Sequence, residues 1–238
     1  MGPMLSMSHL RVIWFDVDGT LYDFRALMRR SLALTLALIH ERHPATRATL
    51  DVEAMVAVRE ELAPLAEGAG ARLQEMRREA FRETLRRYAQ ADDEFVEELV
   101  EVYYSFRWMG LPPYPGVAQC LGELAARYEL GVLSNGNTRP EQLGLGELFT
   151  HRVYAEQVGA SKPARAIFEH AADAAGAGPG ECLLVGDSPL TDIAGARQAG
   201  WRAVWFSPDA EPWPLEDPAP EFIITTFEEL PPLLAGTA

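Results

Sequence analysis

Short apolar runs recur along the chain, and stretches with a helical pattern separate them. The runs lie at residues 12–15, 130–133, 182–185, 203–206 and 222–224. Their apolar residues do not alternate with polar ones, which is typical of strands buried on both faces of a parallel sheet. Helical patterns follow four of the runs, at 138–147, 163–176, 190–199 and 226–234. This alternation predicts an α/β fold with a doubly wound, mainly parallel sheet.

The segment between the first and second runs has a different character. It contains no strand-like run and is rich in Ala, Leu, Glu and Arg, which predicts helices at 25–41, 50–62, 70–90 and 92–106. The sequence GLPPYPG at 110–116 then interrupts any helix and marks the return to the α/β pattern. We therefore expect an α/β core of residues 9–23 and 107–238, with an all-α domain inserted at 24–106.

Composition excludes some classes of function. The 238 residues carry a net charge of −14. A surface of that sign repels phosphate backbones, so we expect no nucleic-acid partner. No apolar stretch approaches 18 residues, so we expect no membrane partner. Two cysteines in apolar contexts, without a signal-peptide pattern at the start, predict a protein of the reducing cytoplasm.

Polar residues of chemical interest follow three of the apolar runs. Asp16 and Asp18 come after the first run, Ser134-Asn135-Gly136 after the second, and Asp187 with Asp192 after the third. Lys162 precedes another helical stretch. Ligands of open α/β sheets bind at the carboxyl ends of the strands, so we expect these groups to share one crevice.

The aspartates predict a metal ion. Asp16 and Asp18 stand two residues apart, which places their side chains on one side of an extended segment. If these two and Asp187 lie about 5 Å apart, each pair repels by roughly 3 kcal/mol at an effective dielectric near 20. A divalent cation removes that repulsion, and Mg²⁺ is typical where phosphate is also bound.

Four segments resemble the motifs of the haloacid dehalogenase-like hydrolase superfamily. They are DVDGT from Asp16, LSNG from Leu133, KP at Lys162, and GDSPLTDIAGARQAG from Gly186. Their order resembles the members that carry a helical cap after the first motif, and the resemblance covers nearly the whole chain. It implies a Rossmann-like core with a cap at 24–106. The family often has Asp-Pro after the Lys-Pro pair, whereas Ala164 and Arg165 stand here.

The resemblance also implies roles. Asp16 is then the nucleophile and Asp18 the general acid and base, with Ser134 and Lys162 as further catalytic residues that hold the phosphoryl group. The metal ligands implied for Mg²⁺ are Asp16, Asp18 through its carbonyl, Asp187 and Asp192. The implied substrate-binding residues are Thr20, Ser134, Asn135, Gly136 and Lys162.

The function that follows is a Mg²⁺-dependent phosphatase acting on a small phosphorylated metabolite. A 2-haloacid dehalogenase is the nearest alternative, but such enzymes typically lack the counterparts of Asp18 and Asp187. A phosphomutase and a non-hydrolytic phospho-acceptor module are further alternatives. Nucleotides, phosphoglycolate and sugar phosphates all stay open as substrates, and so does the oligomeric state.

Arginines of the inserted segment raise a separate question. Six of them interleave with glutamates at helical spacings, at positions 72, 77, 78, 82, 86 and 87. This pattern favours mutual ion pairs on a solvated face over substrate binding. Near the return to the core, Trp108 and Tyr114 are candidates for contact with substrate.

Overall fold

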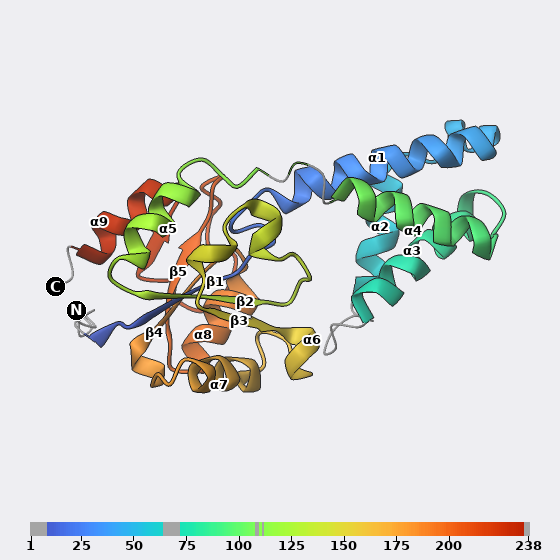
Figure 1. Ribbon diagram of the computed structural model, residues 1–238. Coiled ribbons are helices and arrows are strands. Elements are labelled where there is room, and N and C mark those ends of the chain that lie inside the picture. Colours follow the sequence, from blue (N-terminus) through green and yellow to red (C-terminus); the bar gives the residue numbers. More distant parts are fainter. Residues whose placement is uncertain (1–8, 64–71, 108–109, 111, 236–238) are drawn as a thin grey trace. The chain divides into compact units, whose positions relative to one another are not determined.

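The computed structural model describes residues 9–63, 72–107, 110 and 112–235 (Figure 1). The chain divides into two compact units, one of Met1–Asp23 with Pro112–Ala238 and the other of Phe24–Leu111. We call the first the core unit and the second the helical unit. Within the described residues no helix is long and apolar enough to cross a membrane.

The core unit contains a parallel sheet of six strands in the order β3-β2-β1-β4-β5-β6. In chain order the strands are β1 (Val12–Phe15), β2 (Glu129–Ser134), β3 (His151–Tyr154), β4 (Cys182–Gly186), β5 (Arg202–Phe206) and β6 (Phe222–Ile224). The predicted α/β fold class is confirmed. The strand β3 was not predicted, because its sequence HRVY holds two charged or polar residues and forms no apolar run.

Helices cover both faces of the sheet (Figure 1). On one face lie α5 (Val117–Ala125) and α9 (Leu230–Ala235), and on the other α7 (Arg165–Ala174) and α8 (Gly195–Gln198), with the short α6 (Ala155–Val158) after β3. Alternate residues of β1 therefore face two different cores. Trp14 packs with Phe168 and Trp201 beneath one face, whereas Phe15 contacts Phe149 and Phe227 on the other.

Two predicted helices of the core unit differ in the structure. The segment predicted as a helix at 138–147 forms two 3-10 turns, Pro140–Leu143 and Gly146–Leu148. Gly144 between them has a φ of 71°, which ends the first turn in the left-handed region. The helix predicted at 190–199 begins as a π-helical turn, Pro189–Ala194, before α8. That turn brings Asp192 of the fourth motif inward.

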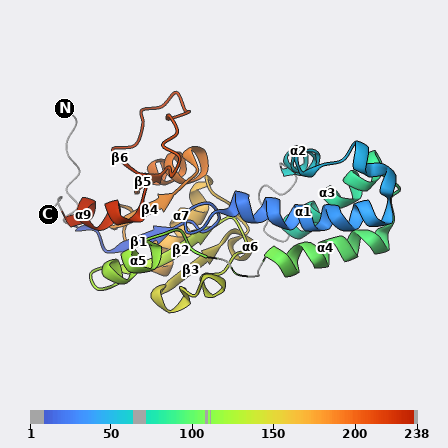
Figure 2. The ribbon, with the colours of Figure 1, turned by 90° about the horizontal axis from the view of Figure 1, so that it is seen from above.

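The helical unit consists of α1 (Phe24–Arg42), α2 (Val52–Leu62), α3 (Arg72–Tyr88) and α4 (Asp93–Arg107), with a 3-10 turn at Pro44–Ala48. Figure 2 shows α1, α3 and α4 side by side. Asp51 begins α2 by accepting a hydrogen bond from the Ala54 amide at 2.8 Å. Apolar residues from all four helices form a core of their own, so this unit packs around a centre separate from the sheet.

Candidate active site

The sheet topology creates one place where the chain reverses direction across the sheet. From β1 the chain continues to β2 and β3 on one side, and it then crosses to β4 on the other side of β1. The carboxyl ends of β1, β2 and β4 meet there, as in other doubly wound sheets that bind ligands at the switch point. Asp16 follows β1, Ser134 ends β2 and Asp187 follows β4. The predicted site residues are therefore neighbours in the fold.

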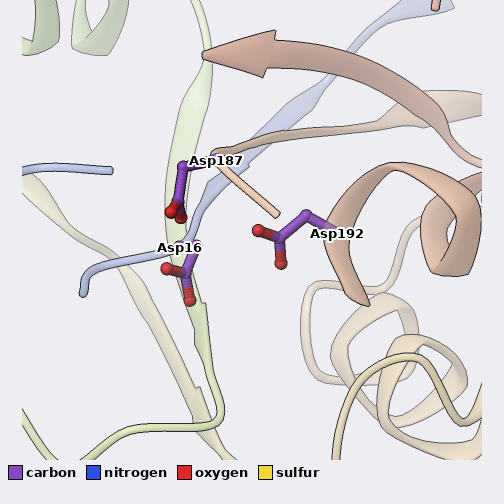
Figure 3. A group of neighbouring side chains, drawn as sticks. All are labelled: Asp16, Asp187 and Asp192. Carbon is purple, nitrogen blue, oxygen red and sulfur yellow. The ribbon is translucent and has the colours of Figure 1, made fainter. Parts of the chain in front are cut away.

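Three carboxylates gather at this point (Figure 3). Asp16, Asp187 and Asp192 each offer one oxygen that lies within 4.8 Å of the other two. The π-helical turn brings in Asp192, whose Oδ2 accepts a hydrogen bond from the Ser188 amide at 3.0 Å. The Asp16 amide donates to the Val185 carbonyl at 3.0 Å, which ties β1 to β4 just below the carboxylates.

Lys162 supplies the positive charge of the site. Its Nζ lies 2.7 Å from Asp16 Oδ1 and 2.7 Å from Asp192 Oδ1, and it donates to the Leu133 carbonyl at 2.7 Å. The side chain is only 3% exposed. Burial alone would lower the pKa of Lys162, but the charges of Asp16 and Asp192 raise it above the ordinary value. One lysine against three carboxylates leaves a formal charge of about −2, which is the charge that one divalent cation balances.

Burial raises the pKa of two of these carboxyl groups. The pKa of Asp187 rises to about 7, first through burial and then through repulsion by Asp192. The pKa of Asp16 is also raised, chiefly by burial, and the attraction of Lys162 opposes that rise. Ionised forms of both groups therefore need a further cation nearby. Three carboxylate oxygen ligands in one small space fit Mg²⁺, which binds through oxygen.

The Thr20 hydroxyl is hydrogen-bonded to Asp187. Its hydroxyl donates to Asp187 Oδ1 at 3.0 Å and accepts from the Asp187 amide at 3.0 Å. The side chain is fully buried. These bonds hold the Asp187 carboxylate in place, and the role of Thr20 in substrate binding stays a prediction. Gly19 beside it has a φ of 95°, and a Cβ there would lie 2.5 Å from Asp187 Oδ2.

The Asp18 carboxylate binds hydroxyl groups and is not a member of the cluster of three carboxylates. Its Oδ1 accepts hydrogen bonds from the Tyr22 and Thr138 hydroxyls, both at 2.5 Å. Both hydroxyl-bearing residues are buried, and their two oxygens lie 3.0 Å apart. A Cβ on Gly136 would overlap Asp18 Oδ2, so a residue with a side chain at that position would displace the carboxylate. Both of these partners of Asp18 are neutral hydroxyls, whereas Asp16 is bound to the charged Lys162.

Tyr22 and Thr138 were not among the predicted site residues. Tyr22 reaches Asp18 because the chain turns back on itself, with the Gly19 amide donating to the Tyr22 carbonyl at 3.2 Å. Thr138 follows Ser134 by four residues and returns to the same place after the second motif. The sequence indicates only that a residue with a hydroxyl group follows the first motif and another follows the second. Such a residue is as typical of a turn as of a functional site.

Asn135 of the second motif is hydrogen-bonded to the backbone of Lys162. Asn135 Nδ2 donates to the Lys162 carbonyl at 2.9 Å, and the Lys162 amide donates to Asn135 Oδ1 at 2.8 Å. The Asn135 side chain is therefore engaged with the loop that carries the lysine. The Gly136 amide donates to Ser134 Oγ at 3.0 Å, which fixes the buried serine hydroxyl at the end of β2.

The remaining predicted positions lie elsewhere. Tyr114 packs edge-on against Phe206, with ring centres 5.3 Å apart, and its amide donates to the Leu21 carbonyl. Trp108 and the Arg72 side chain lie outside the described residues. Arg82, Arg86 and Arg87 pair with Glu79 and Glu83 of α3 as predicted, whereas Arg78 pairs with Glu97 of α4. Arg77 forms no such pair among the described side chains.

Known proteins resemble this chain along most of its length. A family model described as haloacid dehalogenase-like hydrolase matches residues 10–200. The 5-amino-6-(5-phospho-D-ribitylamino)uracil phosphatase of Escherichia coli is 27% identical over 212 residues, which cover 85% of this chain and 86% of that protein. The N-acylneuraminate-9-phosphatase of Rattus norvegicus is 26% identical over 241 residues, covering 97% and 96% of the two chains.

A solved structure is also similar. The 2-haloacid dehalogenase from Pseudomonas syringae pv. Tomato DC3000 superposes with a TM-score of 0.77 and 30% identity, over 96% of this chain and 100% of that one. The curated relatives support the predicted phosphatase type. The family model covers well over half of the 238 residues. The chain is therefore an enzyme of the haloacid dehalogenase-like hydrolase family.

Proposed function

We propose that the protein is a Mg²⁺-dependent phosphatase that hydrolyses a small soluble phosphate monoester through an aspartyl-phosphate. The observation that supports this most is the difference between two aspartates at one strand end. Asp16 is bound to Lys162, and Asp18 is bound to the hydroxyls of Tyr22 and Thr138. A charged nucleophile and a second carboxyl group that exchanges protons are what such a reaction requires.

In the proposed reaction, a carboxylate oxygen of Asp16 forms a bond to phosphorus while the bond from phosphorus to the ester oxygen breaks. Asp18 donates its proton to the departing oxygen. Asp18 then takes a proton from water as that water attacks the aspartyl-phosphate, which releases inorganic phosphate and restores Asp16. Lys162 and the Ser134 hydroxyl hold the phosphoryl oxygens and offset their developing charge.

Asp16, the Asp18 carbonyl and Asp187 are the proposed ligands of Mg²⁺, with Asp192 close by and held to Lys162. Bound Mg²⁺ supplies positive charge that keeps these carboxylates ionised and draws electron density from the phosphoryl group. Thr20 fixes the orientation of Asp187 through two hydrogen bonds. These supports set the positions of the ligands before any ion arrives.

A dehalogenase reaction is the alternative that similarity to a solved structure keeps open. Halide leaves carbon as a stable anion and needs no proton, whereas an alkoxide leaving from phosphorus does. The hydroxyl-bound Asp18 and the acidic cluster have no evident task in halide displacement. We therefore favour the phosphatase. The two buried free cysteines, Cys120 and Cys182, are consistent with the proposed cytoplasmic location.

The proposed reaction is tested with Asp16→Asn and Asp18→Asn. We expect Asp16→Asn to abolish turnover without unfolding the protein. Asp18→Asn should lose about 10²–10⁴-fold on an alkyl phosphate and less on p-nitrophenyl phosphate, because general acid help is worth that much for a poor leaving group. Intact-protein mass spectrometry after acid quench should detect one added phosphoryl group in Asp18→Asn and none in Asp16→Asn.

Two outcomes would contradict this assignment. Equal losses of Asp18→Asn on both substrates, with no covalent species trapped, would exclude the separate roles of the two aspartates. Full activity on aryl phosphates after EDTA treatment would exclude the metal. Release of chloride from 2-chloropropionate by metal-free protein would favour the dehalogenase instead.

The raised pKa of Asp187 predicts a pH-dependent effect of Mg²⁺ on stability. The folded pKa of about 7 exceeds the ordinary value of an aspartate, so the metal-free folded state binds an extra proton between about pH 4 and 7. Stability from this group is therefore present at low pH and is lost as the pH rises towards 7. Mg²⁺ must displace that proton. Below pH 7, the apparent affinity for Mg²⁺ should therefore increase by up to tenfold for each unit by which the pH rises.

The measurement is the melting temperature with and without Mg²⁺ at pH 6 and pH 8. We expect a larger increase at pH 8 in the wild type and in Asp18→Asn, which keeps its carbonyl ligand. Asp187→Asn should show little increase at either pH. An increase in the wild type that is the same at both pH values would contradict the assignment of Asp187.

The hydroxyls on Asp18 predict positioning residues for the acid and base. Tyr22→Phe removes one hydrogen bond to Asp18 Oδ1 and leaves the one from Thr138. We expect kcat on an alkyl phosphate to fall about tenfold, as for loss of one hydrogen bond to a charged group, with a smaller change on p-nitrophenyl phosphate and little change in KM. In an Asp18→Asn background the same change should add almost nothing to the loss. A tenfold loss that persists in that background would assign Tyr22 a role independent of Asp18.

We also propose that the helical unit is a cap that selects the substrate. The two connections of this unit follow Asp23 and precede Pro112, and the first of them leaves the core unit directly after the Asp16 motif. Replacing residues 24–111 by a short linker should preserve hydrolysis of small aryl phosphates and abolish selectivity among phosphorylated metabolites. Circular dichroism verifies that the variant is folded. Unchanged selectivity in the folded variant would refute the proposal.

A further inference from the structure

A tryptophan of β5 binds the backbone of one of the three clustered carboxylate residues. Trp205 Nε1 donates to the Asp187 carbonyl at 2.9 Å, and the Trp205 side chain is only 2% exposed. In the sheet, Trp205 is the neighbour of Gly186, which is the last residue of β4. Strand pairing therefore ends one residue before Asp187, and a side chain fixes the peptide group that follows.

Asp187 is thus held at three of its polar atoms. The Thr20 hydroxyl binds its Oδ1 and its amide, and the Trp205 indole binds its carbonyl. The bonds to the amide and the carbonyl fix the backbone on both sides of Cα, and the bond to Oδ1 sets the rotation of the carboxylate. A metal ligand held in this way keeps its orientation before the ion binds, and loss of such outer support typically weakens metal affinity 10–100-fold.

The segment that connects β5 to β6 supports this tryptophan. Residues 207–221 contain neither helix nor strand. The Trp213 ring packs edge-on against Trp205, with ring centres 5.2 Å apart, and Trp213 Nε1 donates to the Asp217 carbonyl at 2.7 Å. Arg197 of α8 donates to two further backbone carbonyls of the same segment. These contacts tie the segment to the core unit and hold Trp213 against Trp205.

Packing alone is the alternative explanation for Trp205. A buried indole N–H needs an acceptor, and any nearby carbonyl would satisfy it. Trp201 provides the comparison, because it belongs to the same apolar core and packs against Trp14 and Phe168. It lies at the amino end of β5, whereas the carboxylates lie at the carboxyl ends of the strands. A role of Trp205 in the site must therefore separate it from Trp201.

We propose that Trp205 is a positioning residue for Asp187 and that Trp213 supports it, so that the segment 207–221 contributes to the affinity for Mg²⁺. The indole acts through the backbone of Asp187 and is not itself a ligand. This inference rests on the proposed function, because it takes Asp187 to be a ligand of Mg²⁺.

The test is isothermal titration calorimetry of the full chain with MgCl₂ at pH 8, with melting temperatures measured in EDTA. Trp205→Phe keeps an aromatic ring and removes the N–H donor. We expect its Kd for Mg²⁺ to rise about tenfold or more. The Mg²⁺ concentration that gives half-maximal activity should rise equally, while kcat at saturating Mg²⁺ stays near the wild-type value.

Trp201→Phe is the matched control. It makes the same change in the same apolar core, at the end of β5 that is remote from Asp187. We expect it to keep the wild-type Kd for Mg²⁺, even where its melting temperature in EDTA falls. The two readouts thus separate lost packing from lost positioning.

Trp213 tests the support and covers the case in which Trp205→Phe fails to fold, because Trp213 is only partly buried. Trp213→Ala removes the ring contact with Trp205, and its Kd for Mg²⁺ should rise about two- to tenfold, as for loss of one edge-on aromatic pair. Trp213→Phe keeps an aromatic partner and should retain most of the affinity. A wild-type Kd in Trp213→Ala would overturn the role of the segment.

The remaining outcomes distinguish this inference from the proposed function. A wild-type Kd for Mg²⁺ in folded Trp205→Phe would overturn the inference and leave the proposed function standing. An equal rise of the Kd in Trp201→Phe would also overturn it, because the loss would then follow from damage to the core. Absence of Mg²⁺ binding by the wild type would contradict the proposed function itself, and the inference would fail with it.

Discussion

The structure of the site depends on the repulsion among three carboxylates, two buried and one partly buried, and on the lysine that opposes it. Asp16, Asp187 and Asp192 each place an oxygen within 4.8 Å of the others, in a space that water screens poorly. Lys162 contacts two of them and also the carbonyl of Leu133, so a single ammonium joins three separate segments of the fold. The third carboxylate, Asp187, has no such contact, and burial together with repulsion by Asp192 raises its pKa to about 7. The folded core unit thus stores a charge imbalance that a divalent cation relieves.

The two aspartates of the first motif acquire different chemistry from their surroundings, since the side chains themselves are identical. A charged partner favours the anionic form of Asp16, which suits attack on phosphorus. Hydroxyl partners can both donate to and accept from a carboxyl group, so they can hold Asp18 with or without its proton. A turn of a few residues separates these environments. Gly136 leaves the space that the Asp18 carboxylate occupies, and Gly19 leaves the space of the Asp187 carboxylate. The division of labour proposed for Asp16 and Asp18 therefore depends on the packing around the motif as much as on the motif itself.

Residues that follow apolar runs were predictable, because a parallel sheet brings the carboxyl ends of its strands to one edge whatever the connecting helices do. Asp16, Ser134 and Asp187 belong to this class. Residues that reach the site only because the chain turns back towards it were not predictable in this way. Tyr22 and Thr138 reach Asp18 through turns whose direction depends on local dihedral angles, and Thr20 turns towards Asp187 because a buried carboxylate needs a donor. The polar strand β3 was missed because its place in the sheet follows from pairing with β2, and its own composition gives no apolar run.

The same reasoning separates the arginines of the helical unit. Spacing along α3 predicts ion pairs wherever a glutamate stands three or four residues away, and the exposed arginines fulfil this. Spacing cannot reveal which arginine faces inward, because that depends on how α3 packs against α2 and α4. Arg77 is only 4% exposed and its Nη1 donates to the Tyr104 hydroxyl of α4, whereas the adjacent Arg78 pairs with Glu97 of the same helix α4. Two neighbouring arginines of one helix therefore have different surroundings, which the packing of α3 against α4 determines and the spacing of charges along α3 does not.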